Sequence, residues 1–298
     1  MIEMIDAETI YDVPLLLHKE RLDSVVISKL HLKDTKEPNL GTWKNFLGKL
    51  KNPLHEVKIG LIGKYNELPD AYKSIYESFV HAGAVNECKV RVQPIHAEEL
   101  EGSYKDVSKA LAGLNGILVA PGFGERGIDG KLSAIRYARE HNIPFFGICL
   151  GMQVACVEFA RNVLSLSDAA STEVDPGTAN PVIDMMAEQK NITQKGGTMR
   201  LGAYECSLKK KSKAAEAYAS TQISERHRHR WEFNNKYLAD FERAGMLATG
   251  INPDTNLVEI IELPSHPWFV GVQFHPELKS TVENPHPLFV AFVKACMG

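Results

Sequence analysis

A cysteine stands between two glycines, where an apolar run gives way to a helical pattern. The stretch is IPFFGICLGMQ, residues 143–153, and Cys149 lies two residues from Gly147 and two from Gly151. A thiol that only fills space needs no flanking glycines, whereas a thiol on a tight strand-to-helix turn does, because the backbone bends sharply and substrate comes close. The start of the helix would also favour the thiolate, the nucleophilic form of cysteine. Cys149 is therefore a candidate nucleophile.

A thiolate nucleophile needs a base and a group that orients the base, and the segment QFHPE, residues 273–277, contains both residue types. His275 follows a strand-like apolar run, and Glu277 lies two residues on, so their side chains can point the same way from an extended backbone. Each feature alone has a plain interpretation. Cys149 could be a core thiol, and His275 is one of 11 histidines in the chain.

The two motifs together are more specific than either one. G-x-C-x-G-x-Q after a strand, with F-H-P-E far downstream, resembles the class I (triad) glutamine amidotransferase family, and the resemblance covers about residues 57–298. It implies that Cys149 attacks the side-chain amide of L-glutamine and releases ammonia, after which water hydrolyses the glutamyl thioester to glutamate. His275 would then be the general base and later acid, and Glu277 would orient His275.

The resemblance also implies how glutamine is bound. Glu173 in STEVDP would accept the α-ammonium group, and Arg230 in ERHRHRWE would bind the α-carboxylate. The residues after the nucleophile would line the pocket with backbone groups and one side-chain amide; they are Leu150, Gly151, Met152 and Gln153.

One turn departs from the family pattern. The family usually reads Pro-Gly-Gly-Phe-Gly, whereas this chain reads APGFG at residues 120–124. Pro121 therefore stands where the first glycine would be, and proline has no N–H to offer to an oxyanion. We expect the oxyanion hole to use the backbone N–H groups of Gly122 and Leu150 instead.

The basic run RHRHR, residues 226–230, has two other interpretations. Five residues in a chain of net charge −3, without a wider basic surface, argue against a nucleic-acid site. His227 and His229 could bind a metal, but no cysteine or histidine lies at zinc-like spacing, so no metal site is predicted. The remaining four cysteines are expected to pack in the core.

Strand-like and helix-like segments alternate from residue 57 onward. Apolar runs such as VKIGLIGKY, GILVAPGFG and IPFFGICL are separated by helical patterns of 10–15 residues. This alternation predicts an α/β fold with an open, mainly parallel sheet and helices on both faces. Residues 201–262 are expected to add a smaller region of antiparallel strands. In parallel sheets ligands bind beyond the carboxyl ends of the strands, where APGFG and GICLG both lie.

Composition limits the possible functions further. Of 298 residues, 44% are hydrophobic and 24% charged, which is typical of a globular protein. No apolar run reaches the length of a membrane span, and no signal-peptide pattern is present. Five cysteines without regular spacing suit a reducing compartment, so a cytoplasmic location is expected, without membrane partners.

Residues 1–52 read as a separate piece, with a strand-turn-helix predicted over 8–23 and a polar connector before a short helix. The resemblance extends to those amidotransferases that carry an ATP-dependent synthetase domain, which aminates UTP. Residues 1–52 would be the end of that domain and its linker, and residues 53–298 the amidotransferase domain. ATP, Mg and UTP would bind the synthetase domain and not this chain, which needs no cofactor. A homo-oligomer, a tetramer in the family, is expected at full length.

Two other functions remain open at this point. One is a free-standing hydrolase of γ-glutamyl compounds with the same fold. Residues 1–52 argue against it, because they resemble the end of another domain. The other is a catalytically silent glutamine-binding or assembly module. The presence of Cys149, His275 and Glu277 argues against a silent copy, because such a copy is free to lose them.

Overall fold

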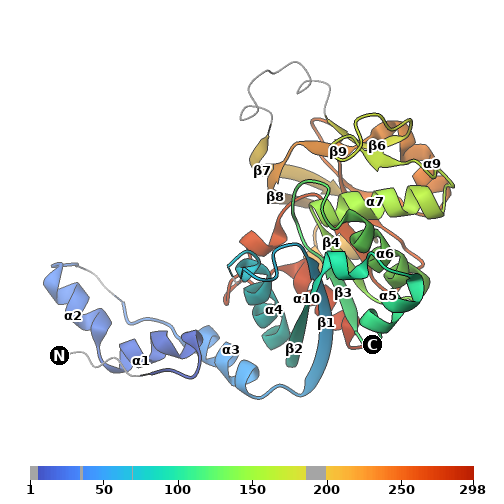
Figure 1. Cartoon of the computed structure of the whole chain (residues 1–298). Helices are drawn as coiled ribbons and strands as arrows, with labels where there is room; N and C mark the ends of the chain where they lie inside the picture. Colours follow the sequence, from blue (N-terminus) through green and yellow to red (C-terminus); the bar gives the residue numbers. More distant parts are fainter. Residues whose placement is uncertain (1–5, 34–35, 69, 186–198) are drawn as a thin grey trace.

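A computed structural model describes residues 6–33, 36–68, 70–185 and 199–298. In these residues a nine-stranded sheet forms the centre of the molecule, in the order β2-β1-β3-β4-β12-β11-β10-β7-β8 (Figure 1). The bounds of its strands are β1 His55–Gly63, β2 Cys88–His96, β3 Gly116–Val119, β4 Phe145–Ile148, β7 Arg200–Leu208, β8 Gln222–His229, β10 Leu247–Ile251, β11 Val258–Glu262 and β12 Phe269–Val272.

The sheet has a parallel half and an antiparallel half. Strands β2, β1, β3, β4 and β12 pair in parallel, and β3, β4 and β12 are buried along their whole length. Their apolar runs do not alternate because helices cover both of their faces. From β12 onward, β11, β10, β7 and β8 add by antiparallel pairing. The change of direction therefore occurs next to the strand that precedes His275.

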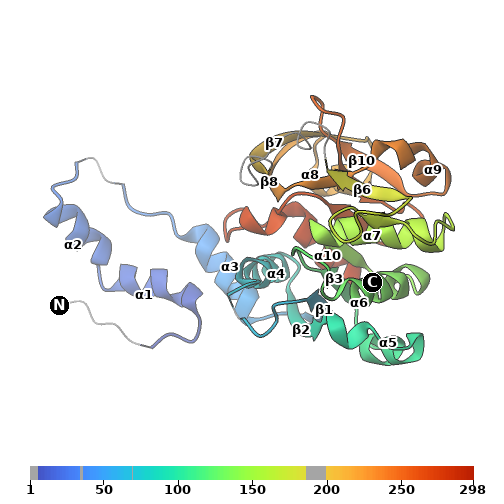
Figure 2. The same cartoon turned by 45° about the horizontal axis from the view of Figure 1, so that its top comes forward.

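Helices cover both faces of the parallel half, as predicted. One face packs against α4 and α10, where Phe289 and Phe292 of α10 contact Phe146 of β4, and the other packs against α6 and α7. Figure 2 shows these two layers on opposite sides of the sheet. The bounds of the helices in this body are α4 Lys73–Val85, α5 Tyr104–Leu111, α6 Ile128–Glu140, α7 Leu150–Asn162, α8 Lys213–Tyr218, α9 Leu238–Arg243 and α10 Pro287–Cys296.

A second, three-stranded sheet lies beside α7, at the top of Figure 1. Its order is β5-β6-β9, and β6 and β9 pair antiparallel. The sheet is short: β5 is Ala170–Ser171, β6 Pro181–Met185 and β9 Trp231–Phe233. The smaller antiparallel region that the sequence predicts thus divides between this sheet and the far half of the large one.

The N-terminal segment is helical, and the predicted strand within residues 8–23 is wrong. A 3₁₀ turn at Ile10–Asp12 leads directly into α1, Val13–Lys19, followed by α2, Leu22–Lys29, and α3, Gly41–Lys51. The apolar run VPLLL has its proline at the second helical position, where the missing N–H costs nothing, and the run therefore starts a helix. Helices α1 and α2 extend away from the body, whereas α3 packs against α4 (Figures 1 and 2).

Candidate active site

Three neighbouring strands end at the same edge of the sheet. β3, β4 and β12 pair side by side and in parallel, with Val119 opposite Gly147 and Val272 opposite Ile148. Because parallel strands bring their carboxyl ends together, the loops that follow them meet. These loops contain Gly122, Cys149 and His275. The structure therefore brings together three predicted site residues, of which Gly122 and His275 lie more than 150 positions apart in the sequence, since 275 − 122 = 153.

Cys149 occupies a strained turn between β4 and α7. Its backbone has φ of 52° and ψ of −104°, a conformation that residues other than glycine rarely adopt. The N–H of Cys149 donates to Val272 O at 2.7 Å. This geometry is that of a nucleophile elbow, which presents a side chain at the top of a sheet. Leu150 is the first residue of α7, so its N–H has no acceptor within the helix. The thiol therefore lies beside unpaired donors at a helix N-terminus.

His275 and Glu277 form a buried pair. His275 Nδ1 lies 2.8 Å from Glu277 Oε1, and both residues are less than one-tenth exposed. Burial lowers the pKa of His275, but the Cys149 thiol and the Glu277 carboxylate outweigh burial and raise this pKa to about 10. Imidazolium is therefore the favoured form at neutral pH, with Nδ1–H held by Glu277 and Nε2–H left for the site.

A cavity of about 280 Å³ opens onto this group. Cys149, Gly122, His275 and Glu277 all line it. Other lining residues are Tyr65 and Tyr72 from the loop before α4, Phe123 from the turn after β3, Arg228 from β8 and Leu278 from the turn after His275. The thiol, the base and the turn that replaces the family's glycine pair thus face one small space.

The turn at residues 121–124 is held from two sides. Lys64 Nζ donates to the carbonyl groups of Phe123 and Gly124 at 2.7 and 2.6 Å. Glu173 Oε1 accepts from the N–H of Gly124 at 3.0 Å. Glu173, predicted to bind the α-ammonium group of glutamine, therefore lies directly against the oxyanion turn. These contacts orient the turn even though Pro121 removes one donor.

A lysine lies behind the same turn. Lys131 of α6 is fully buried, and its Nζ makes no hydrogen bond to any described residue. The atom lies 3.8 Å from the position that a Cβ on Gly122 would take. Burial and the neighbouring Lys64 lower the pKa of Lys131 to about 7, against an opposing effect of Cys149. Nothing in the sequence motif points to this residue.

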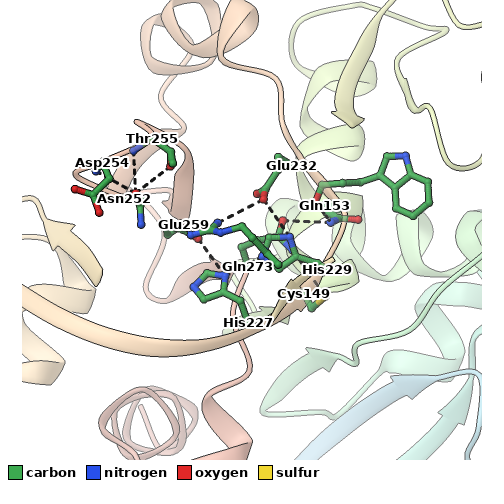
Figure 3. A network of polar contacts seen from close by, with 12 residues as sticks. Cys149, Gln153, His227, His229, Glu232, Asn252, Asp254, Thr255, Glu259 and Gln273 are labelled. Carbon is green, nitrogen blue, oxygen red and sulfur yellow. Dashed lines mark hydrogen bonds and ion pairs between the residues drawn. The ribbon is translucent and has the colours of Figure 1, made fainter. Parts of the chain in front are cut away.

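The predicted pocket residues after Cys149 divide between two roles. Gln153 is buried, and its amide donates to Trp231 O at 2.9 Å and to Gln273 Oε1 at 3.2 Å (Figure 3). Gln273 in turn donates to Cys149 Sγ at 3.7 Å. Met152 is fully buried in the core, and Leu150 and Gln153 line a separate small cavity of about 20 Å³. Gln153 is therefore connected to Cys149, the predicted nucleophile, through Gln273.

Arg230 lies half-buried between β8 and β9, next to a buried network of charged residues. In this network, drawn in Figure 3, Arg200 Nη2 lies 2.8 Å from Glu259 Oε1, and His227 Nδ1 lies 2.8 Å from His229 Nε2. His227, His229 and Glu259 bring three possible ligand atoms within 4.8 Å of one another. Arg200 holds the carboxylate, however, and its charge opposes a cation there. The cluster is therefore better described as a buried ion-pair network than as a metal site.

Burial sets the protonation states in this network. It lowers the pKa of His227 to about 3, helped by Arg200, and lowers the pKa of His229 well below its usual value. Burial raises the pKa of Glu259 and raises that of Glu232 well above its usual range. Both histidines are therefore neutral at physiological pH, so one ring can donate to the other.

Gln273, Lys64 and Lys131 belong to the site, and sequence reasoning missed them. Gln273 stands two residues before His275, so on an extended backbone it points to the same side, and this spacing could have identified it. Lys64 follows strand β1, and Lys131 lies inside helix α6. Neither lysine has a recognisable sequence motif around it. Tyr72 also lines the cavity, and its hydroxyl accepts from Lys64 N–H at 3.0 Å.

Comparison with known proteins agrees with this geometry. The family described as Glutamine amidotransferase class-I matches residues 67–295, well over half of the chain. The chain belongs to this family. The fold and the family that the sequence motifs predict are confirmed. Within class I amidotransferases, the chain is similar to CTP synthases.

The similar proteins are much longer than this chain. CTP synthase of Cytophaga hutchinsonii is 67% identical over 295 residues, which are 99% of this chain and 54% of that protein. CTP synthase of Christiangramia forsetii is 61% identical over 295 residues, again 99% of this chain and 54% of that protein. The amidotransferase chain thus spans about half the length of the curated relatives it matches.

Two solved structures are also similar to this chain. The Trypanosoma brucei CTPS glutaminase domain with bound acivicin matches with a TM-score of 0.76 at 39% identity, covering 80% of this chain and 93% of that one. A putative GMP synthase protein from Thermoplasma acidophilum matches with a TM-score of 0.52 at 18% identity, covering 80% of this chain and 94% of that one, which shows a shared fold. Among the described residues, no helix is long and apolar enough to cross a membrane.

Proposed function

We propose that this amidotransferase hydrolyses L-glutamine to glutamate and ammonia, with Cys149 as nucleophile, His275 as acid and base, and Glu277 as the group that orients His275. The observation that carries this proposal is a thiol on a strained strand-to-helix turn that shares one cavity with a buried His–Glu pair. No other described group in that cavity combines a nucleophile with a base.

The reaction follows from the protonation states. The Cys149 thiolate attacks the amide carbon of glutamine, and the resulting oxyanion is stabilised by the N–H groups at Gly122 and Leu150. His275, protonated by virtue of its raised pKa, gives its proton to the leaving nitrogen, so the C–N bond breaks and ammonia departs. A glutamyl thioester and neutral His275 remain.

Water completes the turnover. Neutral His275 removes a proton from water as the oxygen attacks the thioester carbon, and the C–S bond breaks with return of the thiolate. His275 is again imidazolium, and the second proton of the water leaves with the glutamic acid and passes to ammonia. Glu173 and Arg230 are proposed to bind the α-ammonium and α-carboxylate groups. The contact of Glu173 with Gly124 supports this, because it couples substrate binding to the oxyanion turn.

The experiment is labelling with an electrophilic glutamine analogue, acivicin, followed by intact mass and peptide mapping. One adduct on Cys149 that excess glutamine suppresses is the expected result, and Cys149→Ser should remove both the adduct and the turnover. Cys88→Ala is the matched control, since it removes another buried thiol. A labelled Cys149→Ser variant would refute the nucleophile. No adduct on the unaltered chain would favour the silent module, and faster turnover of γ-glutamyl peptides than of glutamine would favour the free-standing hydrolase.

We further propose that the ammonia is used by a synthetase domain of the CTP synthase kind, which aminates UTP at the expense of ATP and Mg. The similarity over half the length of CTP synthases supports this. Residues 1–52 are proposed to be the end of that domain and its linker, and residues 53–298 the amidotransferase domain. A homo-oligomer and a cytoplasmic location are proposed with it. The five cysteines are all free thiols, which suits a reducing compartment. Mixing the chain with such a domain and measuring CTP from UTP, ATP and glutamine tests the proposal.

A further inference from the structure

The N-terminal segment is linked through helix α4 to the loop that carries Glu277, although Tyr11 and Glu277 lie more than 250 residues apart, since 277 − 11 = 266. Tyr11, at the 3₁₀ turn before α1, is buried against Phe46 of α3, with ring centroids 5.0 Å apart. The same small core includes Val282, which follows the catalytic loop. Trp43 Nε1 also donates to Tyr11 O at 2.7 Å, so the backbone at this residue is held as well.

A continuous line of hydrogen bonds runs from Tyr11 to that loop. The Tyr11 hydroxyl contacts Glu77 of α4 and lies 3.0 Å from His81 Nε2. His81 Nδ1 lies 3.0 Å from Ser280 Oγ, and Ser280 Oγ accepts from the N–H of His286 at 3.2 Å. Ser280 stands three residues after Glu277, at the exit of the catalytic loop.

The direction of each bond is determined by its donors. Tyr11 has one hydroxyl proton, and the Glu77 carboxylate can only accept, so the Tyr11 oxygen must accept from His81 Nε2–H. A neutral His81 then has a free lone pair on Nδ1, which accepts from the Ser280 hydroxyl; burial, which lowers the pKa of His81, favours this neutral form. Every donor in the line therefore has an acceptor, and the arrangement has one orientation.

We propose that Tyr11 is a positioning residue for glutamine hydrolysis: through His81 and Ser280 it holds the loop that carries Glu277, so that the placement of the N-terminal segment governs the glutaminase. The effect of Tyr11 on turnover rests on the proposed function, whereas its effect on the loop does not. Helix α4 is the rigid element between the two ends, since Glu77 and His81 lie on it and Ser78 Oγ reaches Glu277 O at 3.5 Å.

The chemistry of the pair His275–Glu277 explains why a small movement matters. Glu277 orients the His275 ring through a bond of 2.8 Å, and hydrogen bonds weaken steeply when their geometry is lost. Glu173 and Arg230, proposed to bind glutamine, lie on other elements. Loosening the loop is therefore expected to reduce kcat and to leave KM nearly unchanged.

The experiment compares Tyr11→Phe, Ser280→Ala and the double variant in the full chain. Tyr11→Phe keeps the ring packing and removes only the hydroxyl. Tyr104→Phe is the matched control, because Tyr104 also donates to a glutamate, Glu140, at 2.7 Å, but on the exposed surface. Hydrogen exchange of the peptide containing residues 275–286 is the first measurement, and kcat and KM for glutamine are the second.

We expect faster exchange of residues 275–286 in Tyr11→Phe and Ser280→Ala, with kcat about fivefold lower, as for loss of one buried hydrogen bond. The double variant should lose little more than either single variant, because both break the same line. Unchanged exchange in Tyr11→Phe, or a kcat equal to that of Tyr104→Phe, would overturn the proposal. If the unaltered chain did not hydrolyse glutamine, the proposed function would fail, while hydrogen exchange would still decide whether Tyr11 holds the loop.

Discussion

Gly151 lies directly against the main chain of Val119, so closely that a Cβ on Gly151 would be 2.3 Å from the Val119 carbonyl oxygen. Gly147 makes a similar approach, with a Cβ position 2.8 Å from the backbone of Gly151. The two glycines that flank Cys149 thus allow helix α7 to pack onto strands β3 and β4. Their role is close packing beneath Cys149, in addition to the sharp turn that the sequence indicated.

Replacing Gly151 with alanine should therefore displace the start of α7 and destabilise the protein by about 1–3 kcal/mol, as overpacking does. Gly48→Ala is the control, since that helical glycine has open space around it and alanine should stabilise the helix by up to about 1 kcal/mol. Urea unfolding and the rate of Cys149 alkylation measure both effects. A Gly151→Ala variant with unaltered stability and alkylation would contradict the packing argument.

Replacing Glu277 with glutamine should lower the pKa of His275. The folded-state pKa, about 10, lies above the ordinary value of 6.5, so protonation of His275 stabilises the fold fully below pH 6.5 and this contribution is lost as pH rises towards 10. In Glu277→Gln the loss should occur at lower pH. The free energy of unfolding from pH 6 to 10.5, with an NMR titration of the His275 ring, checks this. An identical titration in the two proteins would exclude Glu277 as the cause.

Lys131→Met should stabilise the fold most at low pH. The pKa of Lys131 is about 7 in the folded chain and 10.5 in the unfolded chain, so between these values the unfolded chain binds more protons and stability rises with pH. A methionine has no such dependence. The gain in unfolding free energy should be on the order of 1 kcal/mol or more below pH 7 and should shrink towards pH 10. A constant gain across this range would mean that Lys131 is not the titrating group.

Arg200→Met should be strongly destabilising, by about 3–5 kcal/mol, because it leaves the buried Glu259 carboxylate without its cation. Adding Glu259→Gln to this variant should recover part of the loss. Arg243→Met is the control, since Arg243 pairs with Asp240 on the exposed surface and should change stability by less than about 0.5 kcal/mol. Thermal unfolding of the four proteins suffices, and equal losses at both arginines would refute the network.

Local patterns in the sequence were sufficient for the scaffold of the site. The hydrophobic periodicity of strands and helices depends on neighbouring residues, and so do the glycines and prolines at their ends. The alternation of strands and helices from β1 to α7 could therefore be predicted. The nucleophile Cys149 and the pair His275–Glu277 could be proposed for the same reason, since a strand end and a spacing of two residues are local features. The prediction of an N-terminal strand failed because VPLLL suits either conformation, and in the structure its proline stands at the second position of a helix.

The tertiary structure alone decided which buried polar groups meet. Gln273 beside Cys149, and Tyr11 joined to Ser280 through His81, link segments that are remote in sequence, and Lys131 behind Gly122 joins helix α6 to the turn before it. Such pairs depend on how closely two elements approach, to within the few tenths of an ångström over which a hydrogen bond is made or lost. Sequence period and composition carry no information at that scale. The residues proposed to do the chemistry can thus be found from local sequence patterns, whereas the residues that hold them in place follow from packing.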